Sequence, residues 1–297
     1  MPIPVPYLDE SPLASEALSH ASILFTDLDG TLFAPGGFLL GNAHGAPSTI
    51  TAEAIVALAR AGLDAVITTG RNRIQCTEIS RLVGWPSFIA ELGCIIVTDR
   101  SEEPRYLTGD WPDDAVLPNE TPHEAITRVG ALDTLRRGFP GRIEEHTPWH
   151  TNREVTHMLR GNIDCAEAQA ALDTLELAVD IIDNGIIRPP RHTLVGVTEV
   201  HAYHLVPRGT SKTIAIRRML AERGLTCADA IAIGDSATDV AMADAVALGV
   251  LVRNALDDDR ALTAAALRDN IVATRKERGE GWSEFARAWL SARGSDR

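Results

Sequence analysis

Four carboxylates stand at or just after the ends of apolar runs in this sequence. Asp27 and Asp29 follow the apolar run 21–26. Asp235 follows a second such run, and Asp239 comes four residues later. No cysteine or histidine accompanies them, and oxygen ligands of this kind favour a hard cation such as Mg²⁺. Such a set of residues could support metal-assisted catalysis in which the carboxylates take part.

Two further polar residues occupy comparable places. Thr69 follows the apolar run 65–68, and Lys212 lies in the first turn of an expected helix. A cation there opposes the helix dipole, so we interpret Lys212 as a partner of the carboxylates and of a bound anion. The alternative is a solvated lysine on a frayed helix end.

Each of these positions, taken singly, has a structural explanation. Asp and Thr cap helices, and Asp-Gly or Gly-Asp pairs mark turns. The Asp27-Leu-Asp-Gly string also resembles the start of a calcium loop, but the later ligands of that loop are absent. Their joint occurrence at successive strand ends favours a functional site.

The elements between these residues predict how they come together. Apolar runs at 21–26, 65–68, 87–90 and 94–97 alternate with helical patterns, and the alternation resumes after residue 207. This pattern indicates a parallel sheet with helical crossovers. Ligands bind beyond the carboxyl ends of such strands, so the polar residues should gather on one edge.

The segment between these two parts differs in composition and in its pattern of expected elements. Residues 101–122 are rich in Pro, Asp and Glu, and helices and strands then follow, with an Asn184-Gly185 pair expected to form a hairpin turn. We predict an inserted α+β domain at 99–206. Residues 1–20 are expected to be a loose N-terminal extension.

Composition limits the partners. The chain has 297 residues and a net charge of −13, which disfavours nucleic acid and anionic membranes. No run approaches the roughly 20 apolar residues that span a bilayer, and the start has no signal peptide pattern. The four scattered cysteines indicate a reduced, cytoplasmic protein. The sequence leaves the oligomeric state open.

The motifs as a set resemble a known superfamily. Asp27-Leu-Asp-Gly-Thr31, Thr69-Gly-Arg71, Lys212 and Gly234-Asp-Ser-Ala-Thr-Asp239 are similar, in order and spacing, to the four motifs of the haloacid dehalogenase superfamily. The insert resembles the C2 cap of its Cof-like, type IIB branch. The resemblance implies an α/β fold, with a Rossmann-like parallel-sheet core at 21–98 and 207–297 and the α+β cap at 99–206.

The resemblance also implies roles for particular residues. Asp27 is the expected nucleophile, forming an aspartyl-phosphate, and Asp29 the general acid and base. Mg²⁺ is expected on Asp27, Asp235 and the backbone carbonyl of Asp29. Thr69 and Lys212 are expected to hold the phosphoryl group. Asp239 and Ser236 are expected to support these contacts without touching the substrate, with Asp239 positioning Lys212 or a metal-bound water. The expected substrate contacts are Gly30, Gly70, Arg71, Arg188 and His192.

The activity implied is hydrolysis of a small phosphate ester, a sugar phosphate or phosphorylated sugar acid. A phosphomutase shares these residues, and an inactive binding protein could keep the fold, so both alternatives stay open. Specificity is expected from the polar cap residues Arg142, His146, His157, Arg188, His192 and His204. Many relatives carry Glu-Asn-Gly where this chain has Glu91-Leu-Gly93, so substrate contacts at Leu92 depart from the family pattern.

Overall fold

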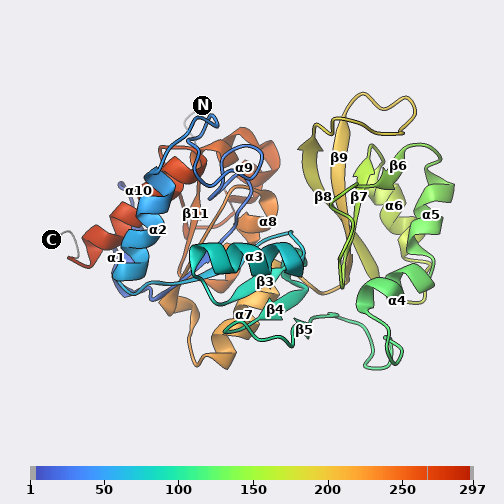
Figure 1. Cartoon of the computed structure of the whole chain (residues 1–297), viewed down its shortest axis with the longest axis horizontal. Coiled ribbons are helices and arrows are strands. Elements are labelled where there is room, and N and C mark those ends of the chain that lie inside the picture. The colour runs from blue at the N-terminus through green and yellow to red at the C-terminus, as the bar shows by residue number, and fades with distance from the viewer. Residues whose placement is uncertain (1–4, 266, 295–297) are drawn as a thin grey trace.

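The computed structural model describes residues 5–265 and 267–294, which form two sheets with their helices. Residues 1–4 of the expected extension, and 266 and 295–297 of the expected core, lie outside the described residues. Figure 1 shows the two parts side by side, the larger at left and the smaller at right. The α/β class predicted from the alternating runs is confirmed.

The larger part is an eight-stranded sheet in the order β12-β11-β10-β1-β2-β3-β4-β5. The pairs from β12 to β3 are parallel, and β4 and β5 are antiparallel additions. Its strands are β1 (Ile23–Thr26), β2 (Asp64–Thr68), β3 (Phe88–Ala90), β4 (Ile95–Val97), β5 (Arg105–Tyr106), β10 (Ala230–Gly234), β11 (Leu248–Leu251) and β12 (Ile271–Ala273).

Helices cover both faces of this sheet, because its central strands are apolar on both sides. One face packs against α1, α2, α3 and α10, and the other against α7. The core helices are α1 (Pro12–His20), α2 (Ile50–Arg60), α3 (Arg73–Val83), α7 (Lys212–Glu222), α8 (Ala237–Val240), α9 (Asp259–Ala265) and α10 (Arg278–Ala292).

The smaller part, the cap, is an antiparallel sheet in the order β6-β7-β9-β8. Its helices pack on one face of the sheet, and the other face is turned toward the core (Figure 1). The strands are β6 (Ile143–Glu145), β7 (His157–Gly161), β8 (Val179–Ile187) and β9 (Val200–Pro207), and the helices α4 (Pro122–Arg128), α5 (Ala131–Gly138) and α6 (Cys165–Leu172).

Two local predictions were wrong. The N-terminal segment is not loose, because α1 is capped by Ser11 and buries Ala14, Ala17 and Leu18 against the core. Asn184-Gly185 is not a hairpin turn, because β8 continues through it with a shift in its pairing to β9. Gly185 has φ +94°, a conformation that suits a bulge as well as a turn.

The boundary of the insert also differs in detail. The predicted linker contains β5, which pairs with β4 at the edge of the core sheet.

Across the described ranges, 5–265 and 267–294, no helix has the length and apolar character needed to cross a bilayer.

Candidate active site

Asp27 and Lys212 form a buried ion pair at the carboxyl end of β1. The Asp27 N–H donates to the carbonyl of Ile233 at 2.9 Å, which fixes this residue at the end of the parallel β1–β10 pairing. Lys212 is the first residue of α7, and its Nζ donates to Asp27 Oδ1 at 2.8 Å and to Asp239 Oδ1 at 2.7 Å. The expected contact of Lys212 with the carboxylates is therefore present.

Asp239 is held from two sides. Its Oδ1 accepts from Lys212, and its Oδ2 accepts from the N–H and hydroxyl of Ser236 at 3.0 and 2.7 Å. This is the capping box of α8, and the N–H of Asp235 donates to the same oxygen at 3.2 Å. Asp239 and Ser236 therefore fix the loop that carries Asp235.

Asp235 lies against Gly30, which is why that position requires glycine. Gly30 has φ +83°, and a Cβ there would lie 2.1 Å from Asp235 Oδ2. Thr31 Oγ1 donates to Asp235 Oδ1 at 3.2 Å, and Asn254 Nδ2 donates to Oδ2 at the same distance. Asn254 also donates to the Gly30 carbonyl at 3.0 Å, so one amide links both motifs.

Asn254 and Thr31 were missed as contacts in the sequence analysis. Asn254 follows β11, so it is one more polar residue just beyond the carboxyl end of a parallel strand. Applying the strand-end rule to β11 would have found it.

The carboxylates of Asp27, Asp235 and Asp239 form a group that fits a divalent cation. One oxygen from each lies within 4.8 Å of the others, and Lys212 makes ion pairs with two of them, Asp27 and Asp239. Burial, with the charges of Asp239 and Asp235, raises the pKa of Asp27 against the opposing effect of Lys212. Burial and Asp239 raise the pKa of Asp235 to about 7. An all-oxygen site with excess negative charge suits Mg²⁺.

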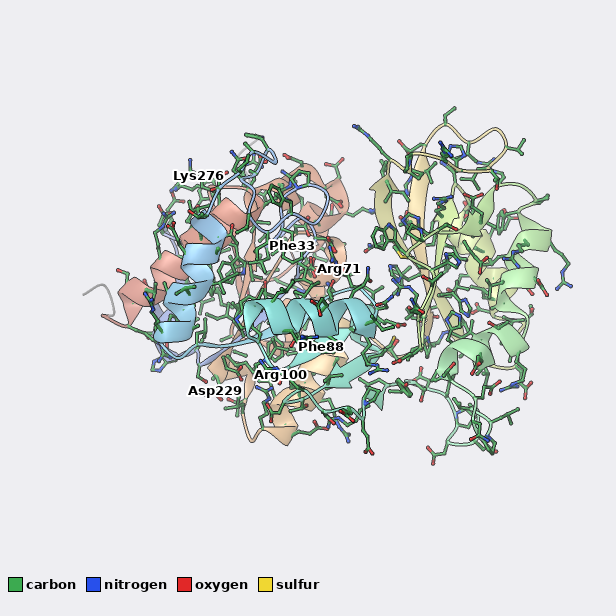
Figure 2. All side chains as sticks on the ribbon, viewed as in Figure 1. Phe33, Arg71, Phe88, Arg100, Asp229 and Lys276 are labelled. Carbon is green, nitrogen blue, oxygen red and sulfur yellow. The ribbon has the colours of Figure 1, made fainter. Side chains whose placement is uncertain are left out.

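Asp29 points to a different partner. Arg71 Nε and Nη2 donate to its two oxygens at 2.7 and 2.5 Å, a bidentate ion pair. The Arg71 guanidinium lies over the Phe33 ring, with its Cζ 5.2 Å from the ring centroid, and the two residues lie together in Figure 2. Asp29 is therefore beside the other carboxylates in the cavity, but its side chain is not part of the group that fits a metal.

Thr69 and Gly70 form the loop between β2 and α3. Thr69 is buried, lines the cavity, and accepts from the Arg71 N–H at 3.3 Å. The carbonyl of Gly70 accepts from Arg153 Nη2 of the cap at 3.1 Å. This loop therefore lines the cavity and contacts the cap.

A cavity of about 510 Å³ lies between these loops and the open face of the cap sheet. Its volume is in the range of small-molecule sites. The core contributes Asp27, Asp29, Gly36, Gly37, Thr69, Gly70, Arg71, Gln75, Leu92, Lys212, Asp235, Ser236 and Thr238. The cap contributes His146, Trp149, Arg153, Met158, Asn184, Ile187, Ala202 and His204.

The structure separates the polar cap residues that the sequence grouped together. His146 and His204 line the cavity, whereas Arg188 and His192 are exposed and lie outside its lining. They follow the end of β8, where the chain no longer runs along the sheet. Arg153, which lines the cavity, was missed because nothing in its local sequence marks it.

Glu91, which precedes the departure from the family pattern at Leu92, has a structural role. The Glu91 carboxylate is fully buried and accepts from the N–H groups of residues 154–156 and from Thr156 Oγ1 at 2.7 to 3.2 Å. It therefore ties the core to the cap. Leu92 lines the cavity with an apolar side chain at the position where many relatives carry an amide.

Comparison with known proteins shows the family of this chain. The family model for haloacid dehalogenase-like hydrolases matches residues 24–109 and 189–279, and the chain belongs to this family. It is 26% identical to a phosphoglycolate phosphatase of Pyrobaculum neutrophilum over 91% of this chain and 96% of that protein. A phosphoglycolate phosphatase of Methanoculleus marisnigri is 27% identical over 78% and 84%.

Solved structures share the fold. The sucrose-phosphatase of Synechocystis, in complex with sucrose and phosphate, matches with a TM-score of 0.59 and 14% identity, over 90% of this chain and 97% of that one. A putative HAD/COF-like hydrolase from Plasmodium vivax matches with a TM-score of 0.60 and 14% identity, over 93% and 99%. The family predicted from the four motifs is confirmed.

Proposed function

We propose that this protein is a Mg²⁺-dependent phosphatase that hydrolyses a small phosphorylated metabolite through an aspartyl-phosphate on Asp27. The observation that carries the proposal is the buried Asp27–Lys212–Asp239 network beside Asp235, at the core end of the cavity between core and cap. A small phosphate ester, a sugar phosphate or phosphorylated sugar acid, is the substrate class we propose. The phosphoglycolate phosphatases among the relatives support a small phosphorylated acid.

Asp27 is the proposed nucleophile. Lys212 donates to Oδ1, so Asp27 Oδ2 is the oxygen left for in-line attack on phosphorus. Attack transfers the phosphoryl group to the carboxylate and breaks the bond to the leaving oxygen. Lys212 holds the nucleophile in one orientation and offsets charge on the transferring group.

Asp29 is the proposed general acid and base. It would protonate the leaving oxygen and then take a proton from the water that attacks the aspartyl-phosphate. Arg71 donates to both oxygens of Asp29, so this ion pair must open before Asp29 can protonate a leaving oxygen. Arg71, Thr69 and the Gly70 backbone are the proposed phosphate contacts.

Mg²⁺ is proposed on Asp27, Asp235 and the Asp29 carbonyl, where it would supply positive charge between an anionic nucleophile and an anionic substrate. Asn254 and Gly30 keep Asp235 in place for this role. Asp239 positions Lys212 and the Asp235 loop.

The test is release of inorganic phosphate from p-nitrophenyl phosphate and from a panel of phosphorylated acids and sugars. We expect Mg²⁺-dependent release that is lost with excess EDTA and in Asp235→Ala. Full activity in EDTA would contradict the metal role. Interconversion of hexose phosphate isomers without phosphate release would instead identify a phosphomutase.

We propose the cytoplasm as the location, because all four cysteines are free thiols and two of them, Cys76 and Cys94, are buried. A small phosphate ester is the only partner the proposal requires.

A further inference from the structure

His204 presents two polar atoms that have no partner in the described part of the chain. It lies on β9, is 1% exposed, and neither ring nitrogen makes a hydrogen bond. His146 is 8% exposed, and its Nδ1 is also without a partner. A buried polar group left unpaired costs about 1–3 kcal/mol. Both histidines line the cavity, so these unpaired nitrogens lie at or just beneath its surface.

Arg153 adds a buried positive charge beside them. It is 7% exposed, and its guanidinium donates to neutral acceptors: the Trp149 carbonyl, Thr156 Oγ1 and the Gly70 carbonyl. Among residues 5–265 and 267–294 it has no carboxylate at ion-pair distance. Burial lowers the pKa of Arg153 against the opposing effect of the Glu91 carboxylate, which accepts from the same Thr156 hydroxyl that Arg153 contacts.

The two ends of the cavity carry opposite charge. The core end holds the carboxylates, whereas the cap residues that line the cavity include no acidic side chain. We name His146, Arg153 and His204 the cap wall. Its one formal charge is positive, so it favours an anionic group over a neutral one.

The histidines of the cap wall can also serve an anion. Burial and Arg153 lower the pKa of His204, and burial with Arg160 and Arg153 lowers that of His146 to about 4. Both rings are therefore neutral at pH 7, and each offers one N–H donor, with the tautomer free to adjust. Two N–H donors and a guanidinium match the acceptor-only oxygens of a carboxylate.

The cap wall is close to the phosphate loop. Arg153 donates to the Gly70 carbonyl, and a Cβ on Gly70 would lie 3.7 Å from His204 Nε2. Gly70 directly follows Thr69, a proposed phosphate contact. A group bound by the cap wall is therefore separated from the phosphorus by only a short linker.

Resting on the proposed phosphatase function, we propose that the cap wall is the leaving-group subsite and that it binds a carboxylate. The substrate class is then a short phosphorylated hydroxy acid, with its carboxylate on Arg153, His204 and His146 and its phosphate on the core residues. Sugar phosphates without an acid group should be poorer substrates.

The test compares two substrates that differ at one group. 3-Phosphoglycerate carries a carboxylate where glycerol 3-phosphate carries a hydroxymethyl group. We expect kcat/KM to be at least tenfold higher for the acid in the unmodified protein. Arg153→Met and His204→Leu should each lower this ratio by at least tenfold, because they remove the charge or a donor from the cap wall.

The ratio is robust to partial loss of folded protein, because both substrates meet the same folded fraction. This matters for Arg153→Met, which also loses the contact to Gly70. His204→Leu replaces unpaired polar atoms by an apolar side chain, and a merely structural role predicts no change in its ratio. The matched controls are Arg142→Met and His192→Leu, exposed positions outside the cavity lining, which should keep the ratio of the unmodified protein.

The possible failures are distinguishable. If p-nitrophenyl phosphate is hydrolysed with Mg²⁺ but the acid is not preferred, the cap wall proposal is overturned and the phosphatase stands. An unchanged ratio in both cap wall variants overturns the proposal in the same way. If no phosphate ester is hydrolysed, the proposed function fails, and the cap wall proposal fails with it.

Discussion

The two ends of the cavity differ in how completely their polar groups are satisfied. At the core end, Lys212, Asp239 and Asp235 each make at least two hydrogen bonds within the protein. At the cap end, His204 is buried, and neither of its ring nitrogens has a hydrogen-bond partner in the described residues. The core end is therefore organised before any substrate binds, whereas the cap end is completed by what binds there. Chemistry and recognition are divided between the two in this way.

The largest expected effect breaks the core end. Asp27→Asn should lower turnover of p-nitrophenyl phosphate by roughly a thousandfold or more, as removal of a nucleophile does in other enzymes. The same change should leave Tm in EDTA nearly unchanged, because Lys212 keeps its ion pair with Asp239 and the amide oxygen of the variant can still accept from its Nζ. Appreciable turnover together with an unchanged melting curve would count against Asp27 as the nucleophile.

A smaller effect is expected at Asn254, which supports the Asp235 carboxylate. Asn254→Ala removes the amide that links Asp235 to Gly30. The Mg²⁺ concentration for half-maximal activity should rise by roughly tenfold to a hundredfold, as for other residues that orient metal ligands. Titration of activity with MgCl₂ measures this. A raised KM for substrate with an unchanged Mg²⁺ requirement would place Asn254 outside the metal site.

The link between the two ends can be weakened at Glu91. Glu91→Gln replaces one of the acceptor oxygens by an amide that faces backbone donors. We expect the free energy of unfolding to fall by about 1–3 kcal/mol, measured by urea denaturation. Glu176→Gln, at an exposed position, is the control and should change it little. Equal stability of the two variants would show that the buried carboxylate does not hold the cap.

The smallest effect concerns the pH dependence of the cap. His157 is buried and stacked on His123, and burial together with His123 lowers the pKa of His157 to about 3. Above pH 6.5 the lowered pKa of His157 does not affect the free energy of unfolding. Stability is lost as the pH falls from 6.5 toward 3, because over this range the unfolded chain binds a proton that folded His157 does not.

The fall in Tm between pH 7.5 and pH 5 should therefore be smaller in His157→Gln than in the unmodified protein. The expected difference is about 2–4 °C, because pH 5 lies about 1.5 units below the ordinary histidine pKa, which is worth about 2 kcal/mol, and a chain of this size unfolds with an entropy of about 0.6 kcal/mol per degree. His192→Gln, an exposed histidine, should follow the unmodified protein. Parallel curves for all three would mean that His157 is not responsible for the pH dependence.

The core end was predictable from sequence because its signals are local. Asp27, Thr69 and Asp235 each follow an apolar run directly, and the parallel sheet then brings them to one edge. The side chain of Asp29 was not predictable in the same way. Its pairing with Arg71 depends on how two loops approach each other.

The cap end was not predictable because it depends on register. His204 faces the cavity and Tyr203 faces the cap helices, and a shift of one residue would exchange them. Arg188 and His192 have suitable side chains, but they lie past the end of β8. Residue type alone does not distinguish them from Arg153, whose placement comes from contacts with Thr156 and Gly70.

Glu91 also adds to the connection between the core and the cap. The chain crosses between core and cap at two places, which lie side by side, since the Asp110 N–H donates to the Arg208 carbonyl at 2.8 Å. The hydrogen bonds of Glu91 to residues 154–156 join the two parts at a second place, where Arg73 also pairs with Glu154. The position of the cap over the site therefore depends on side-chain contacts as well as on the two chain crossings.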